Sequence, residues 1–437
     1  MIEAHTQRKS KLRCIIKKPS PSLWSLKITI SPLYVQTFYQ HACSIQQKKI
    51  DVPGFEHGKA PLSYIEQHFE ISIMSHLKEL FLQHFVIGYL YEQIIAKKLI
   101  TVGDPRLTSI HISQNDGAQF TFELSVLPPP DPIQWENLHF KSPRRKKYKD
   151  LDRQVDHFIS SELDRLKHYP QEGISERDWV NFSITILDET ESKPLLPNYK
   201  QDLWLRIGTE EADKLFHSVF LGKCKGDTVC IQNKGLQAYF SEYIDANYTF
   251  CITILDHIPH HYFCFESFKY QFKLKTDKAI AEKLIEVFSL TNDLPQRRLM
   301  AEATMKLLVT KHHITIPHHL ILREEQAILT KLSSSPDYDV YRLQKNFKQK
   351  VEQLAIKKLK EKVVLDHIAH QHSINVNHHD IRSYLNLSNR DRTKNFVYFD
   401  FIETKLNEQE VPISTQELAH FCLREKTLNY IIFQLTQ

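Results

Sequence analysis

Glycine is scarce in this sequence, and the last part of the chain contains none. The 437-residue chain has ten glycines, of which the last is Gly235. Tight turns between strands favour glycine because it readily adopts positive φ angles, so a long stretch without it is unsuited to a turn-rich β domain. Apolar residues in this stretch recur at helical spacing, for example at Phe347, Val351, Ala355, Leu359 and Val363. We therefore predict an all-α domain over residues 259–437.

Paired cysteines and long apolar runs are also missing. The seven cysteines include no Cys-x-x-Cys pair, which indicates reduced thiols rather than a disulfide or zinc framework. No run of 18 apolar residues is available to span a bilayer. The basic first 24 residues hold an apolar stretch of three residues, Cys14-Ile15-Ile16, which is too short for a secretory leader. We therefore expect a cytoplasmic protein with no membrane partner.

Motifs for cofactors and metals are equally absent from the sequence. No glycine-rich phosphate loop and no Gly-x-Ser-x-Gly elbow occur. The 24 histidines include adjacent pairs such as His260-His261 and His318-His319. Neighbouring side chains point apart on a strand and lie about 100° apart on a helix, which is poor geometry for one ion. We expect no cofactor and no metal site, and we interpret the histidines as solvated or capping residues.

The most informative segment that is present is Gly54-Phe55-Glu56-His57-Gly58-Lys59-Ala60-Pro61, between two helical patterns. The glycines permit unusual backbone angles, the proline stiffens the exit, and the loop leaves the Phe55 ring little core to enter. This composition predicts a presented contact surface. Residues 1–61 also carry ten Lys or Arg against three carboxylates, a local charge of +7. Such a surface suits a polyanion such as RNA, and a solvated basic tail is the alternative.

The loop resembles the ribosome-docking signature of trigger factor, the bacterial chaperone at the nascent-chain exit, which usually reads Gly-Phe-Arg-Lys-Gly-Lys-(Ala/Val)-Pro. Six of the eight positions fit, and Glu56 and His57 replace the Arg and Lys of the family. Residues 314–321 also resemble the (Ile/Val)-Pro-x-x-Leu-Ile element that opens an arm helix in that family. By resemblance, the ribosome-binding residues are Gly54, Phe55, Glu56, His57, Gly58 and Lys59.

The pattern along the chain has the order of elements of that family. Strand-like alternation at 24–30 and 120–126 encloses helical patterns before and after the loop. The resemblance implies an α+β multidomain fold with four parts. These are an α/β ribosome-binding amino-terminal domain (20–135), a linker and arm helix (136–172), a β-rich middle domain of the FK506-binding-protein type (173–258) and an all-α carboxy-terminal chaperone domain (259–437).

The middle domain resembles a peptidyl-prolyl cis-trans isomerase, which needs an apolar aromatic bowl that desolvates a prolyl amide and no nucleophile. Where the family has an aromatic residue and a glycine, this chain has Ile184 and Ile186, and Asp213-Lys214 stand at an apolar helix entry. Two interpretations stay open: an eroded module kept as a scaffold, or weak activity. The candidate pocket residues are Ile184, Trp204, Phe216, Tyr239 and Phe250.

Client binding is harder to place. A holding chaperone needs dispersed apolar groups on a concave surface. The densest aromatic run of the helical part gives the candidates Phe396, Tyr398, Phe399 and Phe401. These residues either line such a surface or close the local core.

The resemblance implies a ribosome-associated, ATP-independent chaperone for nascent polypeptides that assists folding and export. Its partners would be the large ribosomal subunit near the exit tunnel, through protein and RNA, and unfolded nascent chains, and the free protein would form a homodimer. The isomerase-like module would form a distal arm, and Glu56 would face a basic residue of a co-adapted ribosomal protein. The alternatives are a stand-alone prolyl isomerase with helical appendages and a periplasmic chaperone of similar architecture. The missing secretory leader counts against the periplasmic chaperone.

Overall fold

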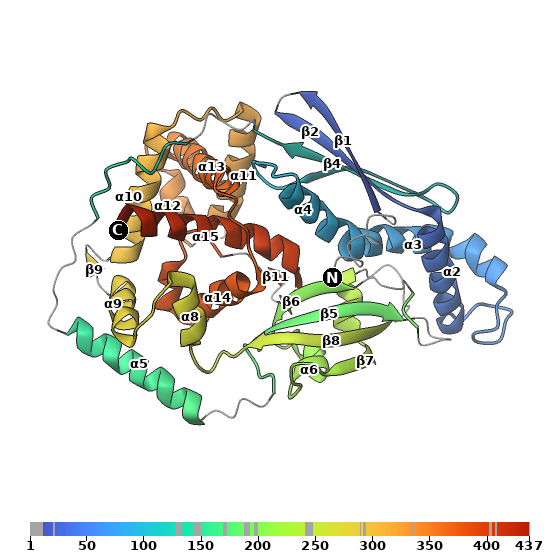
Figure 1. The fold of residues 1–437 in the computed structure, drawn as a ribbon. Helices are drawn as coiled ribbons and strands as arrows, with labels where there is room; N and C mark the ends of the chain where they lie inside the picture. Colours follow the sequence, from blue (N-terminus) through green and yellow to red (C-terminus); the bar gives the residue numbers. More distant parts are fainter. Residues whose placement is uncertain are drawn as a thin grey trace.

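The fold was analysed in a computed structural model. The structure describes residues 12–20, 22–127, 133–142, 150–168, 173–187, 193–195, 200–240, 248–288, 290–291, 294–333, 336–401, 404–406 and 409–436. The proline-rich segment 128–132 and the basic residues 144–147 lie outside these residues. The α+β multidomain fold is confirmed, with an amino-terminal sheet and its helices, a second sheet in the middle, and a helical body (Figure 1).

The amino-terminal sheet is antiparallel, with the strand order β1-β2-β4-β3. Its strands are β1 (Leu12–Ser20), β2 (Leu23–Ile30), β3 (Arg106–Ser113) and β4 (Gly117–Ser125). The predicted strands at 24–30 and 120–126 correspond to β2 and β4. Strand β1 was not predicted, because its exposed residues include Arg13, Lys17 and Lys18 and the segment therefore resembles a basic tail. Its buried Leu12, opposite Ile30 of β2, provides the apolar anchor.

Helices cover this sheet and present the loop. The chain forms α2 (Pro32–Lys49), the loop, and then α3 (Leu62–Phe81), which continues through a π-helical turn (Leu82–Val86) into α4 (Ile87–Ala96). The apolar stripes of α2 and α3 face each other, with the Phe38 and Phe81 rings 5.4 Å apart. The predicted pair of helices that flank the loop is therefore confirmed.

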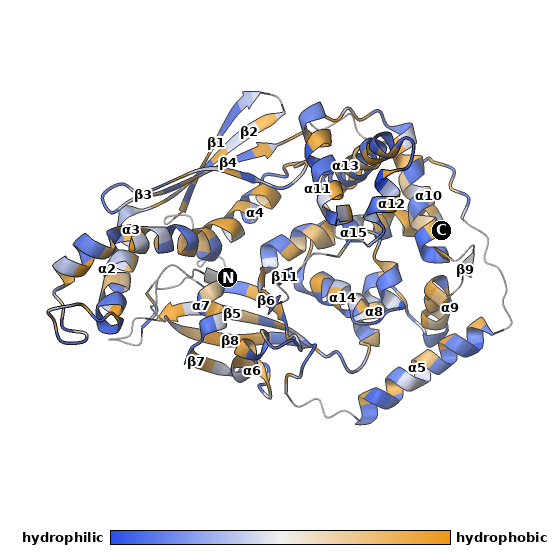
Figure 2. Cartoon of the chain, turned by 180° about the vertical axis from the view of Figure 1, so that it is seen from behind, coloured by the Kyte–Doolittle hydropathy of each residue, from blue (hydrophilic) through white to orange (hydrophobic). Residues whose placement is uncertain are grey.

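The middle sheet has the order β13-β6-β5-β8-β7 and is antiparallel throughout. Its strands are β5 (Trp179–Leu187), β6 (Gln201–Arg206), β7 (Thr228–Gln232), β8 (Thr249–Ile258) and β13 (Ile413–Ser414), with α6 (Lys214–Phe220) and α7 (Lys234–Phe240) against one face. Every residue of β5 is buried, because both faces of the sheet are covered. Figure 2 shows the resulting hydrophobic character of β5 and β8.

The middle module packs directly on the helices of the amino-terminal domain, so the expectation of a distal arm is wrong. Tyr248 is fully buried, and its hydroxyl lies 2.8 Å from Nε2 of His76 in α3. Gln201 at the start of β6 lies 2.8 Å from Nδ1 of His84 in the π-helical turn. Apolar residues of both regions form one continuous core. The sequence could not reveal this, because α3 is apolar on more than one side and its second partner lies about 170 residues away.

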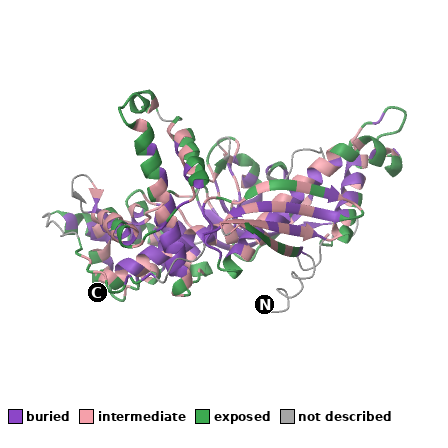
Figure 3. Ribbon diagram, turned by 90° about the horizontal axis from the view of Figure 1, so that it is seen from above, coloured by how far each residue is buried: buried purple, intermediate pink, exposed green. Residues whose placement is uncertain are grey.

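The helical body follows the prediction of a glycine-free all-α region, apart from several two-residue strands. Its helices are α8 (Phe265–Phe272), α9 (Asp277–Phe288), α10 (Gln296–Lys311), α11 (His318–Ser333), α12 (Tyr338–Arg342), α13 (Phe347–Gln371), α14 (His378–Ser388) and α15 (Thr415–Thr436). Helices α11 and α13 pack side by side, and with α12 they form an arm that projects from the body, its outer end mostly exposed (Figure 3).

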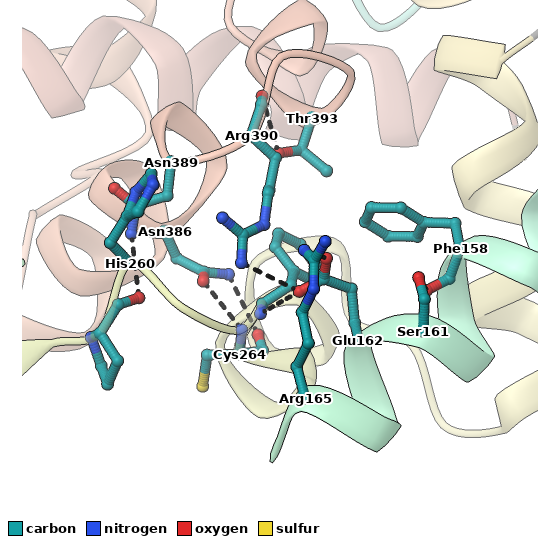
Figure 4. A network of polar contacts seen from close by, with 12 residues as sticks. Phe158, Ser161, Glu162, Arg165, His260, Cys264, Asn386, Asn389, Arg390 and Thr393 are labelled. Atoms are coloured by element: carbon teal, nitrogen blue, oxygen red, sulfur yellow. Dashed lines mark hydrogen bonds and ion pairs between the residues drawn. The ribbon is translucent and has the colours of Figure 1, made fainter. Parts of the chain in front are cut away.

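Helix α5 (Leu151–His168) crosses to this body and is held there by a buried carboxylate. Glu162 is 2% exposed. It accepts hydrogen bonds from Arg165 (2.6 Å), Arg390 (3.1 Å) and the backbone N–H of Phe263 (2.8 Å) (Figure 4). A buried charge is tolerated when it is paired and hydrogen-bonded in this way. The helix is therefore fixed to the chain just after α14 and to the chain before α8.

Candidate functional site

The loop between α2 and α3 (residues 50–61), named the docking loop here after the signature that it resembles, is anchored at both ends and open in the middle. Val52 and Ala60 are buried, whereas the residues between them are mostly exposed. Gly54 and Gly58 have φ angles of +92° and +75°, which side-chain-bearing residues rarely adopt. The Phe55 ring is 41% exposed and leans on Tyr64 of α3, with the ring centroids 5.5 Å apart. The loop thus presents an aromatic ring in a fixed position rather than burying it.

The charged residues of the loop pair with one another. Lys59 forms an ion pair with Glu56, and both side chains are well exposed. Nδ1 of His57 lies 2.6 Å from Oδ1 of Asp51. The two residues that depart from the family signature are therefore part of local contacts. Because these contacts are exposed, each contributes little to stability, and a binding partner could replace either one.

Part of the basic amino-terminal segment forms strand β1. Lys18 of β1 lies over the Trp24 ring, with its Nζ 4.1 Å from the ring centroid. Arg8, Lys9 and Lys11 lie outside the described residues. Strand β1 thus carries exposed cations at one edge of the amino-terminal sheet, so this part of the expected basic tail is an ordered strand.

The isomerase-pocket candidates do not line one open bowl. Ile184, Phe216 and Phe250 are at most 2% exposed and belong to the core shared with the amino-terminal helices. Trp204 is on the other face of the sheet, in a cluster with Tyr384 and Cys422 of the helical body. Tyr239 lies in α7, and its side chain is outside the described residues. The structure therefore brings together three of the five candidates, and does so in a packed interior.

Asp213, which departs from the apolar pattern of the family, has a structural partner. It is 1% exposed, and its carboxylate accepts the backbone N–H of Glu410 (2.8 Å) and that of Glu210 (3.2 Å). Gly208 allows this approach, since a Cβ there would lie 1.7 Å from Oδ2 of Asp213. The helix entry of the module is thus tied to the carboxy-terminal region instead of opening onto a ligand.

The aromatic run at 396–401 joins clusters of the body rather than forming one face. Phe396 is buried against Phe268 and Phe272. The Tyr398 hydroxyl donates to Glu361 (3.0 Å), and Phe399 packs against the α13 cluster. The Phe401 ring stacks on Tyr384 at 5.2 Å. Of the two interpretations left open for these candidates, this arrangement favours the one in which they close the core.

The arm presents exposed apolar residues that sequence reasoning did not single out. On α12 and just after it, Val340, Tyr341 and Leu343 are exposed, Leu343 by 81%. Leu322 on α11 and Leu354 on α13 are exposed as well. The available signal was the short interval between Pro336 and Asn346, since a helix of about one turn and a half cannot bury all of its apolar side chains.

Within the described ranges, no group of three or more His, Cys, Asp or Glu residues is placed to hold a metal ion. In the same residues, no helix combines the length and apolar character needed to cross a membrane.

Comparisons with known proteins agree on one family. Two family models match, "Bacterial trigger factor protein (TF)" over residues 14–160 and its C-terminus over residues 270–430. The trigger factor of Solibacter usitatus (strain Ellin6076) is 25% identical over 207 residues, 46% of this chain and 46% of the relative. That of Protochlamydia amoebophila (strain UWE25) is 27% identical over 168 residues, 37% of this chain and 38% of the relative. The matches therefore span about half or less of these relatives.

A solved structure described as "Promiscuous Substrate Recognition in Folding and Assembly Activities of the Trigger Factor Chaperone" aligns with 96% of this chain and 100% of that chain, at 16% identity and a TM-score of 0.36.

Proposed function

Since models of one family match both ends of this chain and more than half of its length, the chain belongs to the trigger factor family, and we propose that it is a chaperone that docks on the large ribosomal subunit and shelters nascent polypeptides. The observation that carries the proposal is the docking loop, with Phe55 held open between Gly54 and Gly58. An aromatic ring presented by a rigid loop is a typical hot spot of a protein interface.

The test is co-sedimentation of the full chain with large ribosomal subunits. Loss of the Phe55 ring in Phe55→Ala should weaken binding by about 2 kcal/mol, roughly thirtyfold. The matched control is Ile71→Ala, which removes a still more exposed apolar side chain of α3 away from the loop. Equal pelleting of wild type and both variants would remove the loop from the interface.

We place client binding on the arm, where Val340, Tyr341 and Leu343 form an exposed apolar end. Dispersed exposed apolar side chains suit contacts with unfolded chains that need no fixed register. Suppression of client aggregation should need no ATP, and the double substitution Val340→Ser and Leu343→Ser should reduce it. Phe396, at 1% exposure, cannot reach a client without opening the core, so the arm is the better candidate than the aromatic run.

For the middle module we propose a scaffold role rather than prolyl isomerisation. Its apolar candidates are packed against the amino-terminal helices, and Asp213 is engaged by backbone N–H groups. Turnover of a proline tetrapeptide should therefore be weak or absent. A catalytic efficiency near the diffusional ceiling of roughly 10⁸ M⁻¹s⁻¹ would instead favour the isomerase alternative.

The remaining assignments follow from the same premise. We propose a cytoplasmic site of action beside the ribosome and a homodimer of the free chain. Sedimentation velocity across a concentration series would distinguish a dimer from a monomer.

A further inference from the structure

One feature that neither docking nor client binding uses is an open-sided cavity of about 590 Å³ in the helical body. Its lining residues come from the end of α8, α9, the start of α10, the segment after α13, α14 and the last helix, α15, and these helices are labelled in Figure 1. This volume is within the range that holds small organic ligands, roughly 300–1,000 Å³. The cavity is distant in sequence from both the docking loop and the arm end.

The charge of its wall is positive. Its cations are Lys273, Lys283, Arg297 and Lys426, and its carboxylates are Asp380 and Glu425. Lys426 pairs with Asp380 (2.8 Å), and Lys283 pairs with Glu286 behind the wall (2.7 Å). Among the described residues, neither Arg297 nor Lys273 has a carboxylate at ion-pair distance. The wall therefore carries more positive than negative charge, which favours an anionic ligand.

Arg297 is the unusual member of this set. Its side chain is 1% exposed, and its terminal nitrogen donates to Oδ1 of Asn429. Its Nε and the Nδ2 of Asn429 are both buried with no hydrogen-bond partner among the described residues. Unsatisfied buried donors are destabilising, and two of them on one cavity wall are explained if an acceptor occupies the cavity.

The wall carboxylate Glu425 does not supply that acceptor by an ion pair. Glu425 uses Oε1 to accept the backbone N–H groups of Tyr398 (2.8 Å) and Phe399 (2.7 Å). Burial raises the pKa of Glu425 to about 7, so its charge is partly neutralised at neutral pH. Its Oε2 is buried with no hydrogen-bond partner among the described residues. Glu286 and the ionised fraction of Glu425 attract Arg297 and offset its positive charge in part.

The remaining wall is aromatic. Phe272 and Tyr384 are buried, and Tyr430 and Phe433 line the α15 side. The Lys273 Nζ lies 5.0 Å from the centroid of the Phe433 ring, at an exposed position. A ligand that fits these walls needs a flat apolar body, and the guanidinium fork selects a carboxylate at one end.

We propose that this cavity binds a small aromatic carboxylate whose oxygens accept hydrogen bonds from Nε of Arg297 and Nδ2 of Asn429, with its ring between Phe272, Tyr384 and Tyr430. The site is separate from client binding, because its lining residues belong to the body helices and not to the end of the arm.

The test is calorimetric titration of the full chain with 1-naphthoate and with its neutral isostere 1-naphthamide. Naphthoate should bind one to one and at least tenfold more tightly than the amide. Arg297→Gln should weaken naphthoate binding at least tenfold. The matched control Arg298→Gln changes the neighbouring residue, which is 58% exposed and pairs with Glu302, and should leave binding unchanged.

A second pair of variants avoids any change to the buried charge. Thr436→Trp places a bulky ring on the rim of the cavity and should block naphthoate, whereas Gln434→Trp, an exposed neighbour outside the lining, should not. If Arg297→Gln fails to fold, this pair and the amide comparison decide the question. Absent binding of naphthoate, equal binding of the amide, or binding that survives Thr436→Trp would each overturn the proposal.

Discussion

The docking loop and the interior of the molecule use the same residue types in opposite ways. In the loop, Phe55 is 41% exposed and Glu56 forms an ion pair in solvent, whereas Phe250 and Glu162 are almost fully buried. The difference lies in what surrounds each side chain, since the loop stands off the helices and the other two lie between packed elements. Substitutions of exposed loop residues should therefore change the free energy of unfolding little, whereas substitutions of the buried residues should lower it strongly.

The largest effect should come from the buried ring. Phe250→Ala leaves a cavity in the core shared by the middle module and the amino-terminal helices, and should cost about 3–5 kcal/mol of unfolding free energy. Phe55→Ala should stay within about 0.5 kcal/mol of wild type. Urea unfolding followed by circular dichroism compares the two. Equal effects would mean that the ring of Phe250 is not packed as described.

The buried carboxylate gives the next largest effect. Glu162→Gln leaves Arg390 without its charged partner, and removal of one member of a buried pair should cost about 3 kcal/mol. Because Glu162 joins α5 to the body, protease sensitivity of α5 should rise at the same time. The control Asp164→Asn changes an exposed carboxylate on the same helix and should have no effect on either readout.

The contact between the module and the amino-terminal domain should be sensitive to acid. Burial lowers the pKa of His76 to about 3, whereas an unfolded histidine titrates near 6.5. The unfolded state therefore takes up a proton that the folded state resists, and stability falls as the pH drops below about 6.5. Between pH 7.5 and pH 5 this single group should remove about 2 kcal/mol.

The measurement is the pH dependence of unfolding in wild type and in His76→Gln. In the variant, the unfolding free energy should depend less steeply on pH, because the contribution of His76 is removed. The contributions of the other histidines are the same in both proteins and cancel in the comparison. Identical slopes would exclude His76 as the titrating group.

The smallest effect on stability should come from the loop charges. Glu56→Gln removes an exposed ion pair with Lys59 and should change unfolding by less than about 0.5 kcal/mol. Binding is the sharper readout. A freed Lys59 should strengthen binding to RNA and steepen its salt dependence, whereas a Glu56 that faces a basic ribosomal residue predicts weaker binding to ribosomes of the source organism. Pelleting at several salt concentrations distinguishes the two.

Local pattern sufficed for much of the fold. The alternation at 24–30, the stripes of α2 and α3 and the glycine-free carboxy-terminal region all match elements of the structure. Strand β1 was missed because an edge strand with one solvated face needs few apolar residues. The exposed end of the arm was missed because apolar residues in a sequence do not state whether a partner element will cover them.

The family, the element types and the position of the docking loop follow from the sequence, because these depend on backbone preferences and on residues close together in the chain. Three features become visible in the folded chain alone. The middle module packs on the amino-terminal helices, Trp204 faces away from Ile184 and Phe250, and Glu56 pairs with Lys59. The first two depend on contacts between distant segments and the third on the conformation of the loop. No local periodicity encodes which buried face meets which.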